Sequence, residues 1–369
     1  MVFRRGEVSM RLLIAGGGTG GHLYPGIAVA RAWQRCGPEY RVLFVGTKRG
    51  IEARVLPKEE LPLETISAAG LLGRSFAQKL LAAAQLAWGI FQSLGIVGRF
   101  DPNIVLGVGG YGSAPAVVAS WLKRRPIVLL EQNAMPGAAN RLLSRMAKRV
   151  AVCLPGAAKY FAREKVVEMG LPLREEMKAA GPRPDSFWKG PLRVLVFGGS
   201  QGAHAINESV AEALAHLGAA GENFEFVHQT GERDLEWIRQ AYESAGAKGE
   251  AEAFLYDMAE RYRWANLAVA RAGAMTVGEL TAMGLPALLI PLPVSAHGHQ
   301  EANARYMADQ GAARMVLQKD LTGKSLAEFL LEMNRDRTLL AEMSRKALEA
   351  ARKNATDEMT ALCRETART

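Results

Sequence analysis

The chain has little cysteine and nothing that resembles an export signal. Its three cysteines, Cys36, Cys153 and Cys363, are scattered along 369 residues without the paired spacing of a metal site. This usage argues against a disulfide framework and fits a reducing compartment. The first residues include Arg4 and Arg5 but no apolar run, so we expect no secretory signal. The sequence also lacks internal repeats of solenoid length.

Acidic residues are scarce in the first part of the chain. Residues 1–170 contain 23 Lys and Arg against 10 Asp and Glu, a net charge of +13, whereas residues 171–369 contain 23 against 27, a net charge of −4. A basic N-terminal half indicates a negatively charged partner, and the charge alone leaves nucleic acid, anionic lipid and a phosphorylated substrate open. General solubility is the alternative explanation.

Glycine, by contrast, is abundant and gathers in three loops. A short apolar strand, a run of glycines and a helical pattern follow one another in residues 12–33 and again in residues 193–207, and a third glycine loop lies within residues 104–115. Such loops make tight turns and aim the backbone N–H groups of a following helix at an anion. Strands and helices alternate along the chain, which predicts an α/β fold with parallel sheets. The length favours two domains, with a linker in residues 170–176 and 181–191, which are rich in Pro and Gly.

Residues 80–98 contain no charged side chain and are expected to form a helix. A membrane span takes roughly 20 apolar residues, but glutamines and glycines interrupt this stretch. A second apolar face, with Leu81, Trp88 and Phe91, is typical of a helix that lies on a membrane surface, and a fully buried helix is the alternative. The face expected toward the sheet comprises Leu80, Ala83, Ala87, Ile90, Leu94 and Val97.

The first glycine loop satisfies the G-x-G-x-x-G pattern of dinucleotide sites over residues 16–21. The acidic residue that usually ends the second strand and holds ribose is replaced by Gly-Thr-Lys-Arg at residues 46–49, which disfavours NAD and leaves NADP open. His22 follows the loop at a helix start, where imidazolium is disfavoured, so the ring can accept a proton. We therefore expect His22 to be a general base, with a structural helix cap as the alternative.

Polar residues also follow a strand at residues 127–133, where Glu131, Gln132 and Asn133 are placed to meet a ligand. Residues 134–149 are expected to form a basic helix and residues 252–255 a strand.

Two later residues suit a sugar nucleotide. Glu279 stands one turn into a helix behind Gly273, where a carboxylate can accept from two ribose hydroxyls, although a solvent-facing glutamate is the alternative. His297 and His299 have no evident third ligand, so we expect no metal site. Gln300 can donate to and accept from sugar hydroxyls.

As a set, these residues resemble a known family. The motifs are Gly17-Gly-Thr-Gly-Gly-His22, Gly109-Gly-Tyr-Gly-Ser113, Glu131-Gln-Asn133, Gly198-Gly-Ser-Gln-Gly202, Asp257-Met258, the segment from Arg271 to Glu279, and His299-Gln300. They are similar to those of the MurG family of bacterial UDP-N-acetylglucosamine:undecaprenyl-pyrophosphoryl-MurNAc-pentapeptide N-acetylglucosaminyltransferases. The resemblance implies the glycosyltransferase-B fold, with two Rossmann-like domains whose parallel sheets face across a cleft. Residues 10–170, joined by a C-terminal helix at 350–369, would form the acceptor and membrane side, and residues 171–349 would bind the donor.

The resemblance also implies roles for individual residues, with His22 as the base. The UDP-GlcNAc contacts would be Thr19, Gly20, Gly21, Asn133, Arg174, Ser200, Leu255, Ala274, Met275, Thr276, Val277, Gly278, Glu279 and Gln300. Leu255 would meet uracil through its backbone. The acceptor diphosphate would lie against Gly18, Gly109, Gly110, Tyr111, Gly112 and Ser113. The family pattern implies no required cofactor and no metal ligand, and stimulation by Mg²⁺ stays open.

The implied reaction is an inverting transfer of GlcNAc from UDP-GlcNAc to the MurNAc C4 hydroxyl of undecaprenyl-linked lipid I, which forms lipid II for peptidoglycan. The implied place is the cytoplasmic face of the bacterial inner membrane, where the protein is peripheral on an anionic surface. Cell-wall or division proteins would be further partners, and nucleic acid would not. The alternatives are another enzyme of the same fold, such as a UDP-GlcNAc 2-epimerase or a diacylglycerol glycosyltransferase, and a non-catalytic NADP-binding protein.

Overall fold

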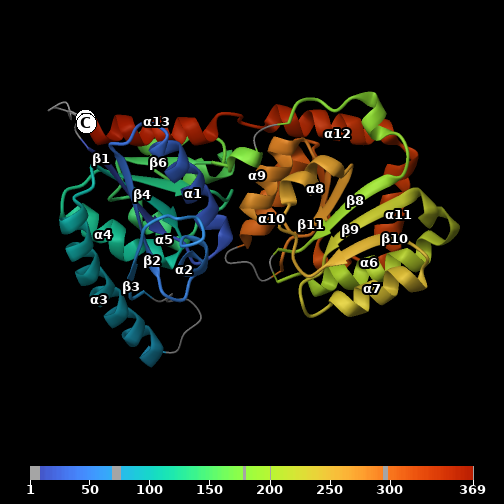
Figure 1. The fold of residues 1–369 in the computed structure, drawn as a ribbon, viewed down its shortest axis with the longest axis horizontal. Coiled ribbons are helices and arrows are strands. Elements are labelled where there is room, and N and C mark those ends of the chain that lie inside the picture. The colour runs from blue at the N-terminus through green and yellow to red at the C-terminus, as the bar shows by residue number, and fades with distance from the viewer. Residues whose placement is uncertain (1–8, 69–75, 178–179, 200, 294–297, 369) are drawn as a thin grey trace. The chain divides into compact units, whose positions relative to one another are not determined.

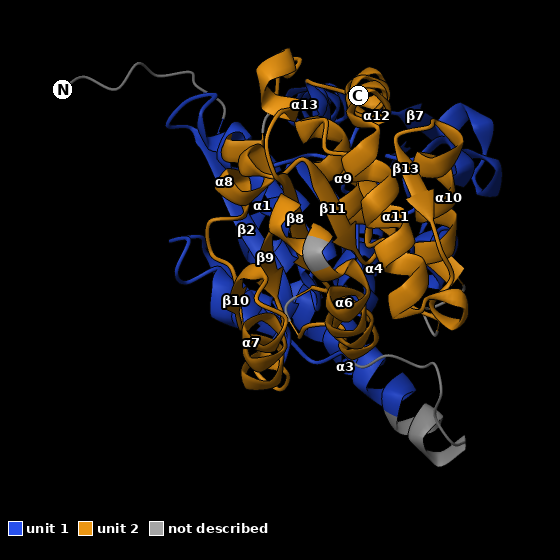
Figure 2. Cartoon of the chain, turned by 90° about the vertical axis from the view of Figure 1, so that its right-hand side faces the viewer, with its two compact units in different colours: residues 1–175, 354–369 blue, residues 176–353 orange. Residues whose placement is uncertain are grey.

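The structure is a computed structural model that describes residues 9–68, 76–177, 180–199, 201–293 and 298–368. The chain divides into two compact units (Figure 2). Unit 1 comprises residues 1–175 and 354–369, and unit 2 comprises residues 176–353. The elements of each unit can be followed in Figure 1.

In its described residues, unit 1 contains one parallel sheet of seven strands in the order β3-β2-β1-β4-β5-β6-β7. The strands are β1 (Met10–Gly16), β2 (Tyr40–Thr47), β3 (Leu63–Ile66), β4 (Ile104–Gly109), β5 (Ile127–Glu131), β6 (Arg149–Val152) and β7 (Val166–Glu168). The helices are α1 (Gly20–Gln34), α2 (Glu52–Val55), α3 (Phe76–Phe100), α4 (Ala114–Leu122), α5 (Ala138–Leu143) and α13 (Ala355–Arg368). The central strands are buried along nearly their whole length, as expected for a parallel sheet covered on both faces.

The C-terminal helix α13 belongs to unit 1, where it packs on α1 and contacts β4 and β5. A threonine joins the outgoing and returning segments of the chain. The Leu173 N–H donates to Thr356 Oγ1 (3.1 Å), and the Thr356 hydroxyl donates to the Leu173 carbonyl (3.0 Å). This pair of hydrogen bonds fixes α13 at the point where the chain leaves unit 1.

Helix α3 lies close to its neighbours through small residues. A Cβ atom on Gly89 would lie 2.1 Å from the Ser67 carbonyl oxygen, so only glycine allows this approach. Ser93 is fully buried on the same side. The predicted sheet-facing side is wrong at Ala83 and Ala87, which are exposed. It is confirmed at Val97, which is buried in the core, and at Leu94, which packs against that core. The small residues Gly89 and Ser93 contribute little to an apolar pattern, yet they make the closest packing.

The second apolar face of α3 is open to solvent in the part that is described. The Trp88 side chain is 55% exposed and Phe91 is 65% exposed, and their rings stack with centroids 5.4 Å apart. The side chain of Leu81 lies outside the described residues. Among the helices that the structure describes, none combines the length and apolarity needed to cross a bilayer.

Unit 2 repeats the architecture with a parallel sheet of six described strands in the order β10-β9-β8-β11-β12-β13. The strands are β8 (Leu192–Phe197), β9 (Phe224–Gln229), β10 (Lys248–Glu252), β11 (Leu267–Ala270), β12 (Ala287–Leu289) and β13 (Ala313–Met315). The helices are α6 (His204–Leu217), α7 (Leu235–Ser244), α8 (Met258–Trp264), α9 (Ala274–Met283), α10 (His299–Asp309), α11 (Gly323–Arg335) and α12 (Arg337–Ala350). Both sheets confirm the predicted α/β fold class.

Two predicted elements differ from the structure. The predicted strand at 252–255 is β10, which ends at Glu252. It is an edge strand with little apolar character, so its pairing with β9 rather than its own pattern sets its bounds. The predicted helix at 134–149 is only α5, because Pro136 and Gly137 precede it and a turn follows Leu143.

A buried polar network joins α6, β9 and α7 in unit 2. Asn207 donates its amide hydrogens to the Thr230 carbonyl (2.9 Å) and to the Asp234 carboxylate (2.8 Å). Its side-chain oxygen therefore accepts from His228 Nε2 (3.0 Å), and the Tyr242 hydroxyl lies 3.3 Å from His228 Nδ1. Each buried group has a partner, so the neutral form of His228 is stabilised where it lies.

This network predicts an acid-sensitive stability. Burial lowers the pKa of His228 from 6.5 to about 3. As the pH falls through 6.5, His228 is therefore protonated in the unfolded chain but stays neutral in the folded chain. The stabilisation is complete above pH 6.5 and is lost as the pH falls toward 3, by about 2 kcal/mol between pH 7 and pH 5. Denaturant titrations at both pH values should show a shallower loss for His228→Asn than for the parent. The exposed His216 gives the matched control, His216→Asn, which should keep the parent slope. Equal slopes for His228→Asn and the parent would contradict the assignment.

Candidate active site

The two glycine loops of unit 1 meet at the carboxyl ends of β1 and β4. These strands are neighbours in the sheet, and the strand order reverses between them, which is where ligands bind in such folds. Gly16 has φ of 128°, and a Cβ atom there would lie 2.4 Å from the Gly109 carbonyl oxygen. A Cβ atom on Gly110 would lie 2.7 Å from the Gly17 carbonyl oxygen. The loops therefore touch through bare backbone, and side chains are excluded from the contact.

His22 lies in the first turn of α1, and its ring packs against the glycine loop that follows β4. A Cβ atom on Gly109 would be 3.0 Å from His22 Nδ1, so the ring packs directly on the backbone there. Nδ1 lies 3.3 Å from Gln132 Oε1, and Gln132 donates from Nε2 to the Val108 carbonyl (2.8 Å). The ring of the predicted base thus reaches across two strand ends to the polar segment after β5.

The buried carboxylate of Glu52 binds the glycine loop that follows β1 through hydrogen bonds. Glu52, which is 1% exposed, accepts from the Gly18 N–H (2.7 Å), the Thr47 N–H (2.7 Å) and the Thr47 hydroxyl (2.9 Å). The N–H of Gly18, predicted to serve the acceptor diphosphate, is therefore already engaged. Cβ atoms on Gly17 and Gly50 would collide with this carboxylate, at 2.6 Å and 2.1 Å.

A second buried carboxylate organises the loop after β5. Glu131 is 1% exposed and accepts from the Asn133 N–H (3.0 Å), Asn133 Nδ2 (3.2 Å), the Gly137 N–H (3.2 Å) and Asn140 Nδ2 (2.9 Å). Burial raises the pKa of Glu131, and these four hydrogen bonds oppose the rise. Glu131 and Gln132 were expected to meet a ligand, but both side chains are turned into the protein, whereas Asn133 is half-buried.

The other predicted residues of unit 1 lie around these loops. Thr19 is exposed and caps α1 by position, and Gly20 and Gly21 form its first turn. Tyr111 is 44% exposed, whereas the buried Ser113 hydroxyl donates to the Gly110 carbonyl (2.8 Å). Gly112 is buried beside Ser113. The Arg174 guanidinium lies 4.9 Å from the ring centroid of Tyr24 on α1, which places this predicted diphosphate contact in unit 1.

In unit 2, the start of α9 carries several predicted donor contacts. The N–H groups of Ala274, Met275 and Thr276 occupy the first turn, where helices have no internal acceptor. Val277 donates to the Gly273 carbonyl (3.0 Å) and is buried, so it holds the helix start. Gly278 follows inside the helix.

Glu279 is oriented by a buried tyrosine. The Tyr262 hydroxyl donates to Glu279 Oε2 (2.9 Å), and the Tyr262 ring packs edge-on against Phe197. A carboxylate held in this way can present acceptor positions to two neighbouring hydroxyls without a large loss of side-chain entropy.

Two predicted contacts in unit 2 are partly committed to the fold. The Leu255 N–H donates to Gln229 Oε1 (2.9 Å), so its carbonyl is the backbone group that suits the imide N–H of uracil. Gln300 Oε1 accepts from the Ala272 N–H (3.3 Å) and the Leu292 N–H (3.0 Å), which ties this side chain to two backbone segments. Ser200 lies outside the described residues.

In the described part, no three His, Cys, Asp or Glu side chains gather as metal ligands do.

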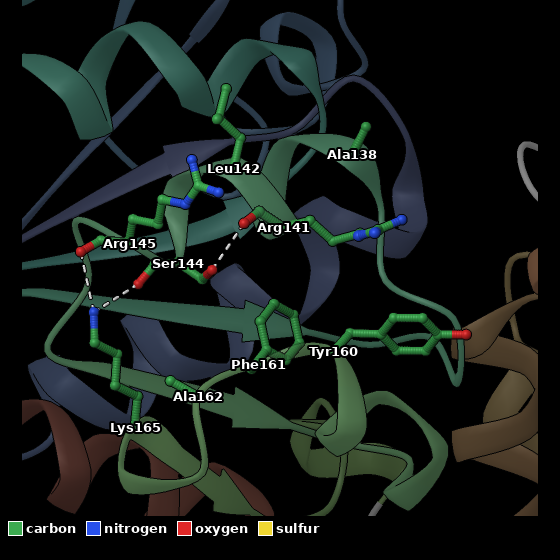
Figure 3. Close-up of a pocket in the computed structure, with 9 residues that line it drawn as sticks. All are labelled: Ala138, Arg141, Leu142, Ser144, Arg145, Tyr160, Phe161, Ala162 and Lys165. Carbon is green, nitrogen blue, oxygen red and sulfur yellow. Dashed lines mark hydrogen bonds between the residues drawn. The ribbon is translucent and has the colours of Figure 1, made fainter.

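A pocket of about 560 Å³ in unit 1 contains none of the predicted site residues. Figure 3 shows it between α5 and the turns that follow β6. Lys165 donates to the carbonyls of Ser144 and Arg145 (3.0 Å each), and so caps the end of the α5 segment. The lining residues are Ala138, Arg141, Leu142, Ser144, Arg145, Tyr160, Phe161, Ala162 and Lys165.

Sequence reasoning missed three residues that shape these sites: Glu52, Gln229 and Tyr262. Glu52 lies on α2, just beyond the place where a dinucleotide-binding chain would carry its ribose-binding acid, but it binds loop amides instead. Its position five residues after the end of β2 is the one sequence feature that indicates a role at this site. Gln229 and Tyr262 follow no sequence pattern that singles them out.

Comparisons with known proteins agree with this architecture. Residues 12–152 match the glycosyltransferase family 28 N-terminal domain, and residues 193–359 match the glycosyltransferase family 28 C-terminal domain. A curated UDP-N-acetylglucosamine--N-acetylmuramyl-(pentapeptide) pyrophosphoryl-undecaprenol N-acetylglucosamine transferase from Geobacter metallireducens is 44% identical over 349 residues, which cover 94% of this chain and 96% of that protein.

Solved structures extend the comparison. MurG from Acinetobacter baumannii superposes with a TM-score of 0.79 at 31% identity, and the match covers 96% of this chain and 99% of that one. CalG4, the calicheamicin glycosyltransferase, has a TM-score of 0.65 at 17% identity over 96% and 98% of the two chains, and therefore shows a shared fold only.

The fold and the matched domains together define a glycosyltransferase with the glycosyltransferase-B fold. More specifically, the chain belongs to the MurG family, whose members match it over nearly its whole length.

The role of Glu52 generates a stability prediction. Glu52→Ala removes three hydrogen bonds to a buried charged group, so it should lower the free energy of unfolding by about 3 kcal/mol or more. Glu59→Ala is the matched control, because Glu59 only forms a partly exposed ion pair with Arg31 and should change stability by about 0–1 kcal/mol. Denaturant unfolding of both variants gives the comparison. Equal effects would show that the carboxylate does not anchor the loop.

Proposed function

We propose that this protein transfers GlcNAc from UDP-GlcNAc to the MurNAc C4 hydroxyl of lipid I, forming the β-linked disaccharide of lipid II. The observation that carries the proposal is the match of 44% identity, over nearly the full length of both chains, to a relative with that transferase name. The site residues are consistent with the chemistry. The enzyme is a UDP-GlcNAc-dependent N-acetylglucosaminyltransferase.

On the acceptor side, His22 takes the proton of the C4 hydroxyl as its oxygen attacks the anomeric carbon. The bond from the anomeric carbon to the UDP oxygen breaks at the same time, and attack from the opposite face inverts the configuration. At the edge of the contacting loops around Gly16 and Gly109, a Cβ atom on Gly18 would meet nothing closer than Tyr111 Cε1 at 3.8 Å, so a diphosphate can approach the backbone there. Because the Gly18 amide is engaged by Glu52, other loop amides would seat the acceptor diphosphate.

On the donor side, the N-terminus of α9 stabilises the charge that develops on departing UDP. Glu279 accepts from the ribose hydroxyls, and Gln300 donates to the sugar. Backbone amides and the Arg174 guanidinium supply positive potential to the diphosphate, so we propose a reaction that needs no resident metal. Mg²⁺ bound with the nucleotide would add to this stabilisation, and rates measured with EDTA and with Mg²⁺ separate the two contributions.

The acceptor is anchored by a polyprenyl chain, so we propose that the protein is peripheral on the cytoplasmic face of the inner membrane. The N-terminal half carries the net charge of +13. The exposed Trp88 and Phe91 on α3 offer an apolar contact. Trp121 and Leu122 at the end of α4 are also about half exposed and run directly into a basic segment.

An epimerase of the same fold is the alternative that the fold leaves open. A UDP-GlcNAc 2-epimerase needs no acceptor, whereas the proposed transferase releases UDP only when lipid I is present. Acceptor-dependent release of UDP therefore separates the two activities.

Glu279→Ala should weaken UDP binding by about 1.5–3 kcal/mol, the range for hydrogen bonds to a charged group. Tyr262→Phe, which keeps the carboxylate but removes its anchor, should weaken binding less. Calorimetry with UDP measures both. A UDP affinity of Glu279→Ala within about twofold of the parent would remove the ribose role, because that is far less than one such hydrogen bond contributes.

His22→Ala should lower kcat by about 10²–10⁴, the usual contribution of a general base, at nearly unchanged UDP-GlcNAc affinity. The measurement is steady-state UDP release with saturating donor and acceptor, on a variant whose folding is checked by circular dichroism. A folded variant that keeps more than about a tenth of the parent rate would reduce His22 to a structural role.

Liposome binding should have two components. Basic side chains near an anionic surface contribute about 1 kcal/mol each and weaken with salt, whereas inserted aromatic side chains resist salt. Co-sedimentation should rise with anionic lipid and fall, but not to zero, at high ionic strength. Trp88→Ser with Phe91→Ser should reduce the salt-resistant part and leave UDP binding intact. If the double variant sediments like the parent, then α3 is not the docking surface.

A further inference from the structure

We infer that Gln132 is a positioning residue that fixes the tautomer of His22, so that Nδ1 carries the hydrogen and Nε2 carries the basic lone pair. The inference rests on the proposed function for its catalytic meaning, but the tautomer itself can be measured without substrate.

The orientation of the Gln132 amide follows from its second partner. The Val108 carbonyl can only accept, so the Gln132 atom 2.8 Å from it must be the nitrogen. The Gln132 oxygen is then the atom that lies 3.3 Å from His22 Nδ1. An amide oxygen can only accept as well, and the contact therefore requires a hydrogen on Nδ1. A neutral imidazole carries one N–H, which leaves the lone pair on Nε2.

The surroundings keep this arrangement in place. Gln132 is 2% exposed, so water does not compete freely for its amide. A Cβ atom on Gly109 would lie 3.0 Å from His22 Nδ1, and one on Gly110 would lie 3.4 Å from His22 Cδ2. The ring therefore packs directly on the glycine loop that follows β4. Because Val108 lies in β4 and Gln132 directly follows β5, two neighbouring strands set the direction of the amide.

The arrangement suits a base that works beside an anionic acceptor. When Nε2 takes the hydroxyl proton, Nδ1 keeps its own hydrogen and its acceptor, and no group at Nδ1 has to reorganise. Gln132 also brings no negative charge toward the ring, unlike the carboxylate partner in serine hydrolases. The nearby carboxylates are instead occupied by other partners. Glu52 accepts from the Gly18 N–H and from Thr47, and Glu131 accepts from N–H groups of the segment that follows it.

Nitrogen NMR of the full chain labelled at histidine tests the tautomer directly. The chain has six histidines, and the spectrum of His22→Asn identifies the signals of His22. At a pH where the ring is neutral, His22 should show a protonated Nδ1 and an unprotonated Nε2. A protonated Nε2 in the neutral ring of the parent protein would overturn the inference. This outcome does not depend on the proposed function.

Two variants separate positioning from structural support. Gln132→Met loses both hydrogen bonds, whereas Gln132→Glu cannot donate as an ionised group to Val108 but can still accept from Nδ1. The Met variant should lose the Nδ1–H tautomer and lower kcat by about 10–100-fold, the range for partners that orient metal-bound histidines, with little change in the KM for UDP-GlcNAc. The Glu variant should keep the tautomer and have the higher kcat of the two.

Ser120→Ala is the matched control, because it removes a buried hydrogen bond within α4 of the same unit. It should leave the His22 signals and kcat unchanged. If the Met and Glu variants have the same tautomer and the same kcat, then Gln132 only supports the Val108 carbonyl and the inference is wrong. If the tautomer behaves as described but no variant transfers GlcNAc, then the proposed function fails and the assignment of the tautomer stands.

Discussion

Two buried carboxylates hold the loops of unit 1 from within. The loops at the carboxyl edge of the parallel sheet carry backbone N–H groups, and loops packed as closely as those at Gly16 and Gly109 leave little room for water to satisfy them. Glu52 accepts from one loop and Glu131 from another. With these N–H groups satisfied inside the protein, the outer surface of the loops can remain bare backbone. The position of His22 depends on this rigidity, because His22 follows the loop that Glu52 holds and its ring contacts Gln132, which directly follows Glu131.

Unit 2 fixes its loops with neutral groups instead. Gln229 accepts from Leu255 and donates to the Gly199 carbonyl (2.8 Å), which joins the loop after β8 to the segment after β10. Gln300 similarly joins the backbone at Ala272 and Leu292. Amides can link backbone donors to backbone acceptors without adding negative charge, a favourable choice at an edge proposed to bind a nucleotide diphosphate.

The sequence predicts the fold class well because the central strands are short apolar runs that end in glycine loops. It predicts the position of His22 for the same reason, since the residue directly follows such a loop. It fails where packing depends on small residues, as on α3, where Gly89 and Ser93 rather than Ala83 and Ala87 face the protein. It also misses Glu52 and the inward turn of Gln132, because both depend on neighbours distant in sequence. The assignment of individual residues to UDP-GlcNAc and to the acceptor diphosphate stays a prediction.

The most direct measurement is transfer of labelled GlcNAc from UDP-GlcNAc to a soluble lipid I analogue, with the product characterised by NMR. The account predicts one disaccharide with a β linkage to the MurNAc C4 oxygen, formed together with one UDP. The parent enzyme with UDP-GlcNAc alone should form neither UDP nor an epimerised sugar nucleotide. An α-linked product, or turnover of the donor without the acceptor, would contradict the account.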